Sequence, residues 1–240
     1  MRLRQAGPDP EAWLRPTVVR KASSRADLVA GYRQLIDAGL GTGSSGNLSL
    51  RDSDGMLITP TGVTSARLQV QDVVAMSLDG QVAAGQLRPS SEWHMHAAIY
   101  RARPDVNAVV HCHSRYATIL ACAHRPIPAI HYMIAITAVD EIPVAPYATF
   151  GSDALAQATT ATLGQGRACL LANHGQIAAG EDLSQALSVA QEVEELAVIY
   201  WGSLALGGGE ILSPSAMLEV HTAFATYGQQ QGDQSGEHDA

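Results

Sequence analysis

Asn107-Ala108-Val109-Val110-His111-Cys112-His113 is the stretch from which the fold of this chain can be worked out. It is an apolar run that ends in two histidines, and it predicts a buried strand. Successive side chains of a strand point to opposite faces, so His111 and His113 project together while Cys112 points away. Two imidazoles on one face can chelate a divalent metal, although histidines at strand ends often only form hydrogen bonds.

Two other segments offer ligands for the same metal ion. Glu92 lies in the segment 89–93 (Pro-Ser-Ser-Glu-Trp), in the first turn of an expected helix that runs to about Arg103, and its carboxylate can reach the histidine pair. A second apolar strand, 168–172, ends in the turn Asn173-His174-Gly175, which adds a third imidazole. Three neutral nitrogens and one carboxylate indicate an open catalytic zinc site rather than a closed structural one.

His94 and His96 lie on the expected helix and are rival ligands. Residues two apart point to nearly opposite sides of a helix, so these two imidazoles cannot chelate one ion as a pair. We therefore expect both to be structural or solvent-facing.

The length and charge of the chain exclude several classes of protein. Its 240 residues suit one substantial core, and 46% hydrophobic residues with few aromatic ones favour an α/β domain. A formal net charge of −8 argues against a nucleic-acid-binding protein. No stretch of the sequence resembles a membrane span or a signal peptide, so we expect a cytoplasmic protein without membrane partners.

The three cysteines, Cys112, Cys122 and Cys169, are scattered through apolar runs. Their odd number and their spacing fit neither a disulfide framework nor a CxxC metal site. We expect them to be core thiols in a reducing compartment.

The chain has a single lysine, Lys21, in the basic stretch 15–25. Activation of a carbonyl through a Schiff base needs a lysine that is desolvated in a pocket, and Lys21 is poorly placed for that role. If this chain activates a carbonyl group, a metal must do it.

Residues 41–46, Gly-Thr-Gly-Ser-Ser-Gly, match the dinucleotide-binding pattern GxGxxG. That motif follows a strand and opens a helix, whereas here a predicted helix, 24–40, precedes it and a predicted strand, 47–51, follows it, so we reject a nucleotide site. Backbone N–H groups of this turn, of the turn 59–62 and of the helix start at Ser90 and Ser91 are still candidate phosphate donors. Each is also compatible with ordinary turn chemistry.

Hydrophobic periodicity and turn residues predict the remaining elements. We expect an extension at 1–22, a single domain at 23–228 and a disordered acidic tail at 229–240. Besides the segments above, further helices are expected at 115–124, 152–163, 183–206 and 213–227, and further strands at 56–59, 73–78 and through 142–144.

Seven motifs in order resemble those of the class II aldolase/adducin family, and most of all its members that act on L-fuculose phosphate. The likeness covers about residues 25–228. The motifs are Ser45-Gly46-Asn47-Leu48-Ser49, Ile58-Thr59-Pro60-Thr61-Gly62, Pro89-Ser90-Ser91-Glu92-Trp93, Val110-His111-Cys112-His113, Ile130-His131-Tyr132-Met133-Ile134, Ala145-Pro146-Tyr147-Ala148-Thr149-Phe150-Gly151 and Asn173-His174-Gly175.

The resemblance implies a single-domain three-layer α/β/α sandwich with a largely antiparallel central sheet, assembled as a cyclic homotetramer with active sites between subunits. It implies that Zn²⁺, or another divalent metal, is held by His111, His113, His174 and, without substrate, Glu92. Glu92 would be the catalytic acid/base, and Tyr132 would reach in from the next subunit as the proton donor on the aldehyde side. The implied phosphate-binding residues are Gly46, Asn47, Thr61, Gly62, Ser90 and Ser91.

The implied reaction is the reversible cleavage of a ketose 1-phosphate to dihydroxyacetone phosphate and a short aldehyde. The substrate would be L-fuculose 1-phosphate or a 5-deoxy- or 5-methylthioribulose 1-phosphate. The alternatives are a sugar-phosphate dehydratase or 4-epimerase of the same fold, and a scaffold without catalysis like the adducin head. The three histidines and Glu92 argue against the scaffold, and the segment 130–134 favours an aldolase over an epimerase. One local difference, Gln176 in place of the family's usual apolar residue, is expected beside the metal, where it would affect substrate preference.

Overall fold

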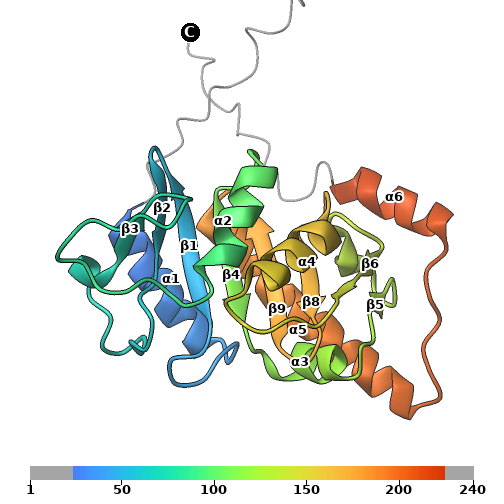
Figure 1. The fold of residues 1–240 in the computed structure, drawn as a ribbon. Coiled ribbons are helices and arrows are strands. Elements are labelled where there is room, and N and C mark those ends of the chain that lie inside the picture. The colour runs from blue at the N-terminus through green and yellow to red at the C-terminus, as the bar shows by residue number, and fades with distance from the viewer. Residues whose placement is uncertain (1–23, 225–240) are drawn as a thin grey trace, which may run out of the picture.

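The computed structural model describes residues 24–224 (Figure 1). The expected extension 1–22, the tail 229–240 and the last residues of the final predicted helix lie outside this range. The helices are α1 Arg25–Asp37, α2 Trp93–Ala102, α3 Arg115–Cys122, α4 Asp153–Leu163, α5 Leu183–Ala205 and α6 Pro214–Phe224, with 3-10 turns η1 Val70–Asp72 and η2 Tyr132–Thr137. The strands are β1 Asn47–Asp52, β2 Gly55–Ile58, β3 Val74–Met76, β4 Ala108–Cys112, β5 Ile127–Pro128, β6 Glu141–Ile142, β7 Val144–Ala145, β8 Ala168–Leu171 and β9 Gly175–Gly180.

Seven of these strands form one sheet in the order β3-β2-β1-β4-β9-β8-β7. All neighbours are antiparallel except β7 and β8, so the expectation of a largely antiparallel sheet is confirmed. The histidine-bearing strand β4 lies at the centre of the sheet. In its register His111 is opposite Asn47 on β1 and Ile177 on β9.

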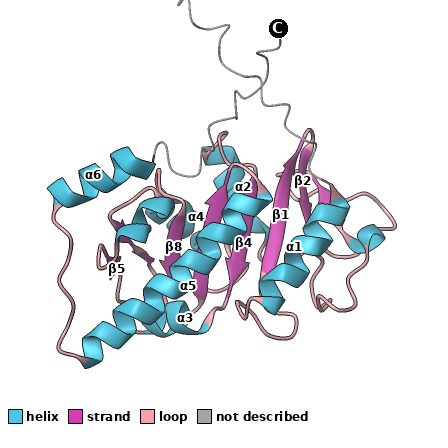
Figure 2. Cartoon of the chain, turned by 180° about the vertical axis from the view of Figure 1, so that it is seen from behind, coloured by secondary structure: helices cyan, strands magenta, loops and turns pink. Residues whose placement is uncertain are grey.

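Helices cover both faces of the sheet and form the outer layers of the predicted sandwich. Figure 1 looks onto α2 and α4, whereas Figure 2 looks onto α1, α3 and α5. Alternation along β4 divides its side chains between the two apolar cores: Ala108, Val110 and Cys112 pack on the α5 side, and Val109 packs on the α2 side. His111 shares the α2 side with Val109, because both residues have the same parity on the strand.

Caps at the helix ends agree with the sequence. Ser24 begins α1 with a capping box, in which its hydroxyl accepts from the Asp27 amide and the Asp27 carboxylate accepts from the Ser24 amide. Ser152 and Asp182 cap α4 and α5, and the side chain of each accepts a hydrogen bond from an amide in the first turn. Within the described residues, no helix combines the length and the hydropathy needed to cross a membrane.

Three predictions about local structure were wrong. The strand expected through 142–144 is two short strands in different sheets, β6 and β7, since Pro143 interrupts the hydrogen-bonding pattern. Strand β9 was not predicted at all, because its small residues Gly175, Ala178, Ala179 and Gly180 give no β-branched or alternating signal. Cys122 is exposed at the end of α3, although Cys112 and Cys169 are buried free thiols as expected.

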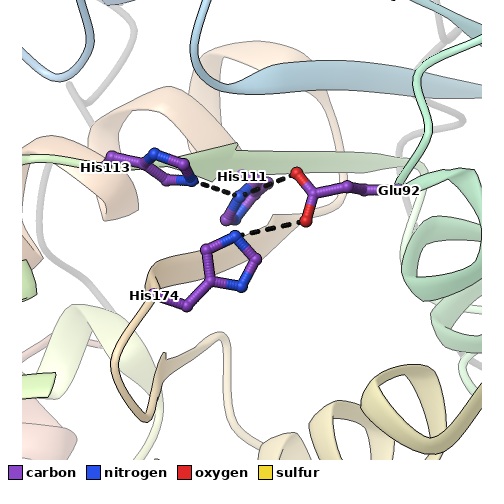
Figure 3. A group of neighbouring side chains, drawn as sticks. All are labelled: Glu92, His111, His113 and His174. Atoms are coloured by element: carbon purple, nitrogen blue, oxygen red, sulfur yellow. Dashed lines mark hydrogen bonds and ion pairs between the residues drawn. The ribbon is translucent and has the colours of Figure 1, made fainter. Parts of the chain in front are cut away.

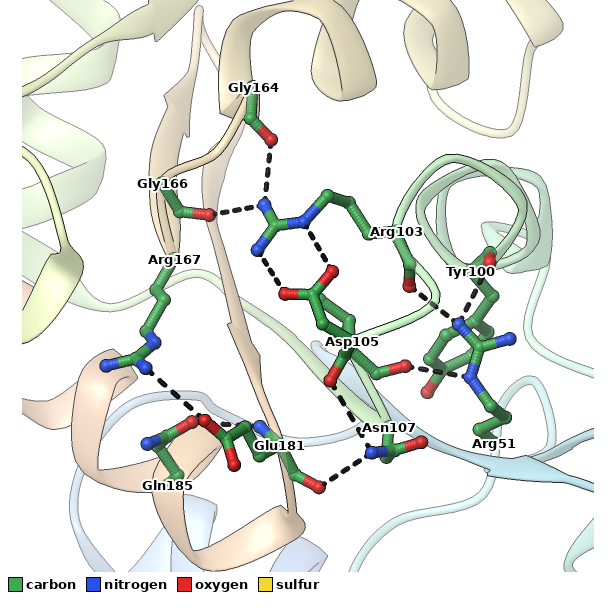
Figure 4. Close-up of polar contacts among 11 residues, drawn as sticks. Arg51, Tyr100, Arg103, Asp105, Asn107, Gly164, Gly166, Arg167, Glu181 and Gln185 are labelled. Atoms are coloured by element: carbon green, nitrogen blue, oxygen red, sulfur yellow. Dashed lines mark hydrogen bonds and ion pairs between the residues drawn. The ribbon is translucent and has the colours of Figure 1, made fainter. Parts of the chain in front are cut away.

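A network around Arg103 holds the connection between α2 and β4 (Figure 4). The Arg103 guanidinium donates to both carboxylate oxygens of Asp105, at 2.8 and 2.6 Å, and to the carbonyls of Gly164 and Gly166, at 2.7 and 3.0 Å. Arg51 on β1 donates to the carbonyl of Tyr100 in the last turn of α2 and to the carbonyls of Arg103 and Val106 in the connection. These bonds fix α2, which follows Glu92, relative to the central strands.

Candidate metal centre

Four side chains from three separate parts of the chain converge at the end of the central strands (Figure 3). They are Glu92, His111, His113 and His174, and each offers a ligand atom within 4.8 Å of those of the other three. His111 lies on β4, His113 follows the end of that strand, and His174 lies in the turn between β8 and β9. The sequence predicted this set, and the fold brings all four members together.

The Nε2 nitrogens of the three imidazoles and the two oxygens of Glu92 face one another. His111 Nε2 lies 3.0 Å from His113 Nε2 and 3.2 Å from Glu92 Oε2. His174 Nε2 lies 3.2 Å from Glu92 Oε1. The imidazole rings meet edge to face, with centroids 4.7–4.9 Å apart, so that their nitrogens and not their ring faces point inward.

A backbone carbonyl sets the tautomer of His111. Its Nδ1 lies 2.9 Å from the carbonyl oxygen of Gln176, which can only accept, so Nδ1 carries the proton. In the neutral ring Nε2 then has a lone pair that faces another Nε2 and a carboxylate oxygen. Such a group of acceptor atoms is stable only around a shared proton or a cation. A metal-ligating histidine commonly donates its other ring N–H to a backbone carbonyl, as His111 does here. The residues therefore fit a divalent metal ion.

The charges in the cluster are strongly coupled. Burial raises the pKa of Glu92, but the charge and hydrogen bonds of His111, followed by those of His174, outweigh burial and hold this pKa below its usual value. Burial lowers the pKa of His111, yet its interactions with Glu92 leave this pKa raised. Burial and the neighbouring imidazoles lower the pKa of His113 to about 4. His113 is therefore neutral at physiological pH and has a lone pair for a metal.

The turn that presents His174 depends on its two neighbours. Asn173 has a φ of 55°, in the left-handed region that asparagine tolerates better than most residues. At Gly175 a Cβ would lie 2.5 Å from the Cys112 carbonyl oxygen and 2.9 Å from the His113 ring. The Asn-His-Gly motif thus combines a left-handed turn with a close approach of β9 to β4.

Several details around the cluster differ from the sequence-based expectation. Helix α2 begins at Trp93, so Glu92 occupies the N-cap position and not the first turn. Ser90 and Ser91 do not cap the helix by side-chain hydrogen bonds; instead Ser90 Oγ accepts from the Glu92 amide at 3.3 Å. The main chain makes a turn here, in which the Trp93 amide donates to the Ser90 carbonyl at 3.2 Å.

The side chain of Gln176 is not beside the metal centre, contrary to expectation. It is fully buried on the α5 side of the sheet, where its Nε2 donates to Ser114 Oγ at 2.7 Å and to the Ala190 carbonyl at 3.1 Å. The parity of β9 explains this, because Gln176 is opposite Cys112 and both side chains leave the His111 face. Only the backbone carbonyl of Gln176 reaches the centre.

The rival histidines take no part in the cluster. His96 is fully buried, which confirms a structural position and excludes a solvent-facing one, and its ring bonds to Ser49 and Asn47. His94 is partly buried and stacks on Trp93 with ring centroids 3.9 Å apart.

The segments expected to bind phosphate lie next to the cluster. Asn47 Nδ2 donates to Glu92 Oε2 at 3.1 Å, and the Gly46 backbone passes so close to β4 that a Cβ would lie 2.9 Å from the His111 carbonyl oxygen. The turns 59–62 and 88–91 run side by side, and Pro60 and Pro89 form an isolated antiparallel β-bridge. The Thr61 amide donates to the Arg88 carbonyl, and the Ser90 amide donates to the Thr59 carbonyl. Thr61, Gly62 and Ser91 are exposed there, with Ser90 buried behind them.

An open cavity of about 370 Å³ adjoins the cluster and contains residues that the sequence reasoning did not assign. Glu92, His113 and His174 line it on one side, and Tyr147 and Phe150 line the other, with 64% and 66% of their surfaces exposed. The signal available in the sequence was their place in the motif 145–151, which contains both aromatic residues. Tyr132 is not among the lining residues; it is 48% exposed on η2.

An α/β domain with this cluster at the end of its central strands is a class that comparison with known proteins also finds. The chain belongs to the class II aldolase and adducin family: the family described as "Class II Aldolase and Adducin N-terminal domain" matches residues 26–201.

Similar proteins within this family carry aldolase names. A 5-methylthioribulose-1-phosphate/5-deoxyribulose-1-phosphate aldolase of Rhodospirillum rubrum is 46% identical over 85% of this chain and 92% of that protein. An L-fuculose phosphate aldolase of Haemophilus influenzae is 44% identical over 81% of this chain and 90% of that protein. The solved structure of an L-fuculose 1-phosphate aldolase superposes with a TM-score of 0.82 and 37% identity, covering 85% of this chain and 97% of that one.

Proposed function

We propose that this chain is a metal-dependent aldolase that reversibly cleaves a ketose 1-phosphate to dihydroxyacetone phosphate and a short aldehyde. The candidate substrates are L-fuculose 1-phosphate and the 5-deoxy- and 5-methylthioribulose 1-phosphates, which are the sugars in the names of the similar proteins. Relatives with the two kinds of name are 46% and 44% identical, so similarity alone does not choose between them.

The observation that carries this proposal is the convergence of three Nε2 atoms and one carboxylate beside an open cavity. His111, His113 and His174, with Glu92, would hold a divalent cation, for which Zn²⁺ is the first candidate because imidazole nitrogens and a carboxylate suit it. A metal bound there supplies Lewis-acid polarisation of a ketone. The chain has one lysine in all, Lys21, outside the described residues, which agrees with metal-assisted rather than Schiff-base chemistry.

The proposal assigns the following roles to the chain's own groups. During cleavage the bond between C3 and C4 of the ketose breaks, and its electrons stay with C3. The C4 hydroxyl, which becomes the aldehyde, gives up its proton on the Tyr132 side. Glu92, buried next to His111, returns a proton to C3 and so completes dihydroxyacetone phosphate. Backbone and hydroxyl donors at Gly46, Asn47, Thr61, Gly62, Ser90 and Ser91 would hold the phosphate.

A coupled assay for dihydroxyacetone phosphate over the three ketose phosphates tests this function. We expect turnover of at least one substrate, its loss in excess chelator and its recovery when Zn²⁺ is restored. Glu92→Gln should remain folded and lose roughly 10²–10⁴-fold in kcat, because an amide cannot accept the proton. No product from any of the three sugars, or undiminished turnover after the metal is removed, would contradict the proposal.

We also propose that the active unit is a homotetramer in which Tyr132 of one subunit completes the site of the next. Tyr132 is half-exposed and is absent from the residues that line the cavity within one chain. Other large apolar side chains, Trp201, Leu206, Ile211 and Leu218, are exposed on α5, α6 and the segment between them. Apolar surface of this kind suits a contact with another subunit.

Mixing two inactive variants tests the composite site. Glu92→Gln and Tyr132→Phe damage different halves of each site, so random exchange in a closed ring leaves about a quarter of the sites with both residues intact. Activity should therefore recover from near zero to about a quarter of the parent's. Verified subunit exchange without recovery would place both residues in one chain.

A further inference from the structure

A continuous line of buried polar side chains runs from Glu92 into the core on the α2 side of the sheet. Glu92 Oε2 lies 3.1 Å from Asn47 Nδ2, and Asn47 Oδ1 lies 2.6 Å from His96 Nε2. His96 Nδ1 lies 2.7 Å from Ser49 Oγ, which in turn lies 2.7 Å from the Tyr100 hydroxyl. All five residues are buried, at 7% exposure or less.

The two ends of this line fix the direction of every hydrogen bond in it. The ionised Glu92 carboxylate can only accept, so the Asn47 carboxamide must present its N–H to Glu92 and its oxygen to His96. His96 Nε2 must then carry the proton, which in a neutral ring leaves Nδ1 to accept from Ser49. The Ser49 hydroxyl, having donated to His96, accepts from Tyr100.

The surroundings of the line agree with that direction. Burial lowers the pKa of His96 to about 3, so its ring is neutral and has one donor and one acceptor nitrogen. The Arg51 guanidinium lies 4.7 Å from the centre of the Tyr100 ring and is itself tied to the backbone that follows α2.

We propose that Tyr100, Ser49 and His96 are positioning residues: their one-way chain of hydrogen bonds locks the Asn47 carboxamide with its N–H toward Glu92. A reversed carboxamide would place its oxygen against a carboxylate oxygen and push Glu92 out of its position. These hydrogen bonds therefore keep Glu92 in the orientation that its acid–base role requires. This inference rests on the proposed function of Glu92, but its first test does not.

The first test is spectroscopic and needs no turnover. Histidines labelled with ¹⁵N, with His96 assigned by its disappearance in His96→Gln, should show a protonated Nε2 and a bare Nδ1 in both metal-free and zinc-loaded protein. Ser49→Ala removes the donor to Nδ1 and should reduce the population of this tautomer. A proton on Nδ1 of His96 in the parent protein would overturn the proposal, because Asn47 would then be oriented the other way.

The second test compares variants that keep or remove the hydrogen bond to Asn47. His96→Leu cannot donate and should lower kcat by roughly 10- to 100-fold, the range typical for groups that support metal-site residues, with little change in KM. His96→Gln can donate from its amide and should recover most of the loss. Ser49→Ala is a milder change for the case in which His96→Leu does not fold, and its kcat should fall in the same direction.

Thr159→Val is the matched control. It also removes a buried hydroxyl beside α2, one that lies 3.6 Å from Met95 Sδ. This hydroxyl does not belong to the line of hydrogen bonds from Tyr100 to Glu92, so kcat should be unchanged. Parent-like kcat in both His96→Leu and Ser49→Ala, with Glu92→Gln inactive, would overturn the positioning role and leave the role of Glu92 intact. An active Glu92→Gln would instead overturn the proposed function while the tautomer measurement still stands.

Discussion

A single methyl group added at Gly175 should damage the candidate metal centre although no ligand is substituted. The new Cβ would lie 2.5 Å from the Cys112 carbonyl oxygen and 2.9 Å from the His113 ring, whereas real Cβ contacts stay beyond 3.0 Å. Strand β9 must therefore move away from β4 by about half an ångström, or His113 must turn aside. Overpacking of this kind costs about 1–3 kcal/mol, and a shifted ligand should weaken metal binding roughly 10- to 100-fold.

Two measurements separate these effects. Urea unfolding in excess chelator gives the change in stability alone, because a bound metal would add its own stabilisation. Competition with a chromophoric chelator then gives the zinc affinity of Gly175→Ala. The control is Gly202→Ala in α5, where the added Cβ meets nothing within 4 Å and should stabilise the helix by up to about 1 kcal/mol. Parent-like stability and zinc affinity in Gly175→Ala would refute the steric argument.

Three further predictions concern charged and titratable side chains. His113→Ala should lose its zinc in a metal assay, whereas His94→Ala should retain about one zinc per chain; the opposite result would mean that His94, and not His113, is a ligand. Arg103→Met should lower the free energy of unfolding by about 1.5–3 kcal/mol in urea titrations, since it leaves hydrogen-bonded carbonyls without a donor. Arg101→Met, which loses an exposed ion pair with Asp79 and an exposed hydrogen bond to the Leu78 carbonyl, should cost at most about 1 kcal/mol. Burial lowers the pKa of His96 to about 3, so between about pH 6.5 and pH 3 the ring takes up a proton only when the chain unfolds. The contribution of the neutral ring to the free energy of unfolding is therefore complete well above about pH 6.5 and is lost toward pH 3 at about 1.4 kcal/mol per pH unit. Unfolding titrations at pH 6.5 and 5 should therefore show a loss about 2 kcal/mol larger in the parent than in His96→Gln, and equal losses would contradict the neutral buried ring.

The pair of histidines at the end of β4 could be predicted because its arrangement is local. The parity of a strand decides that His111 and His113 share a face, and it needs no knowledge of the neighbouring strands. The turn that presents His174 likewise has a local signal, because Asn173 tolerates the left-handed region that it occupies. Alternation and capping residues also marked most helices and strands correctly, because those signals act within a few residues.

The tertiary structure decided what depends on pairing between distant segments. Strand β9 lies between β4 and β8 although its residues have a low β-propensity. The hydrogen bonds and packing of its two neighbours stabilise it in the sheet. This register gives His111 its carbonyl partner and sends the Gln176 side chain to the opposite face, while the register of β1 on β4 sets Asn47 opposite His111. The sequence alone determined which groups could bind a metal. How those groups are oriented depends on contacts between residues 45 to 65 positions apart, which no local pattern contains.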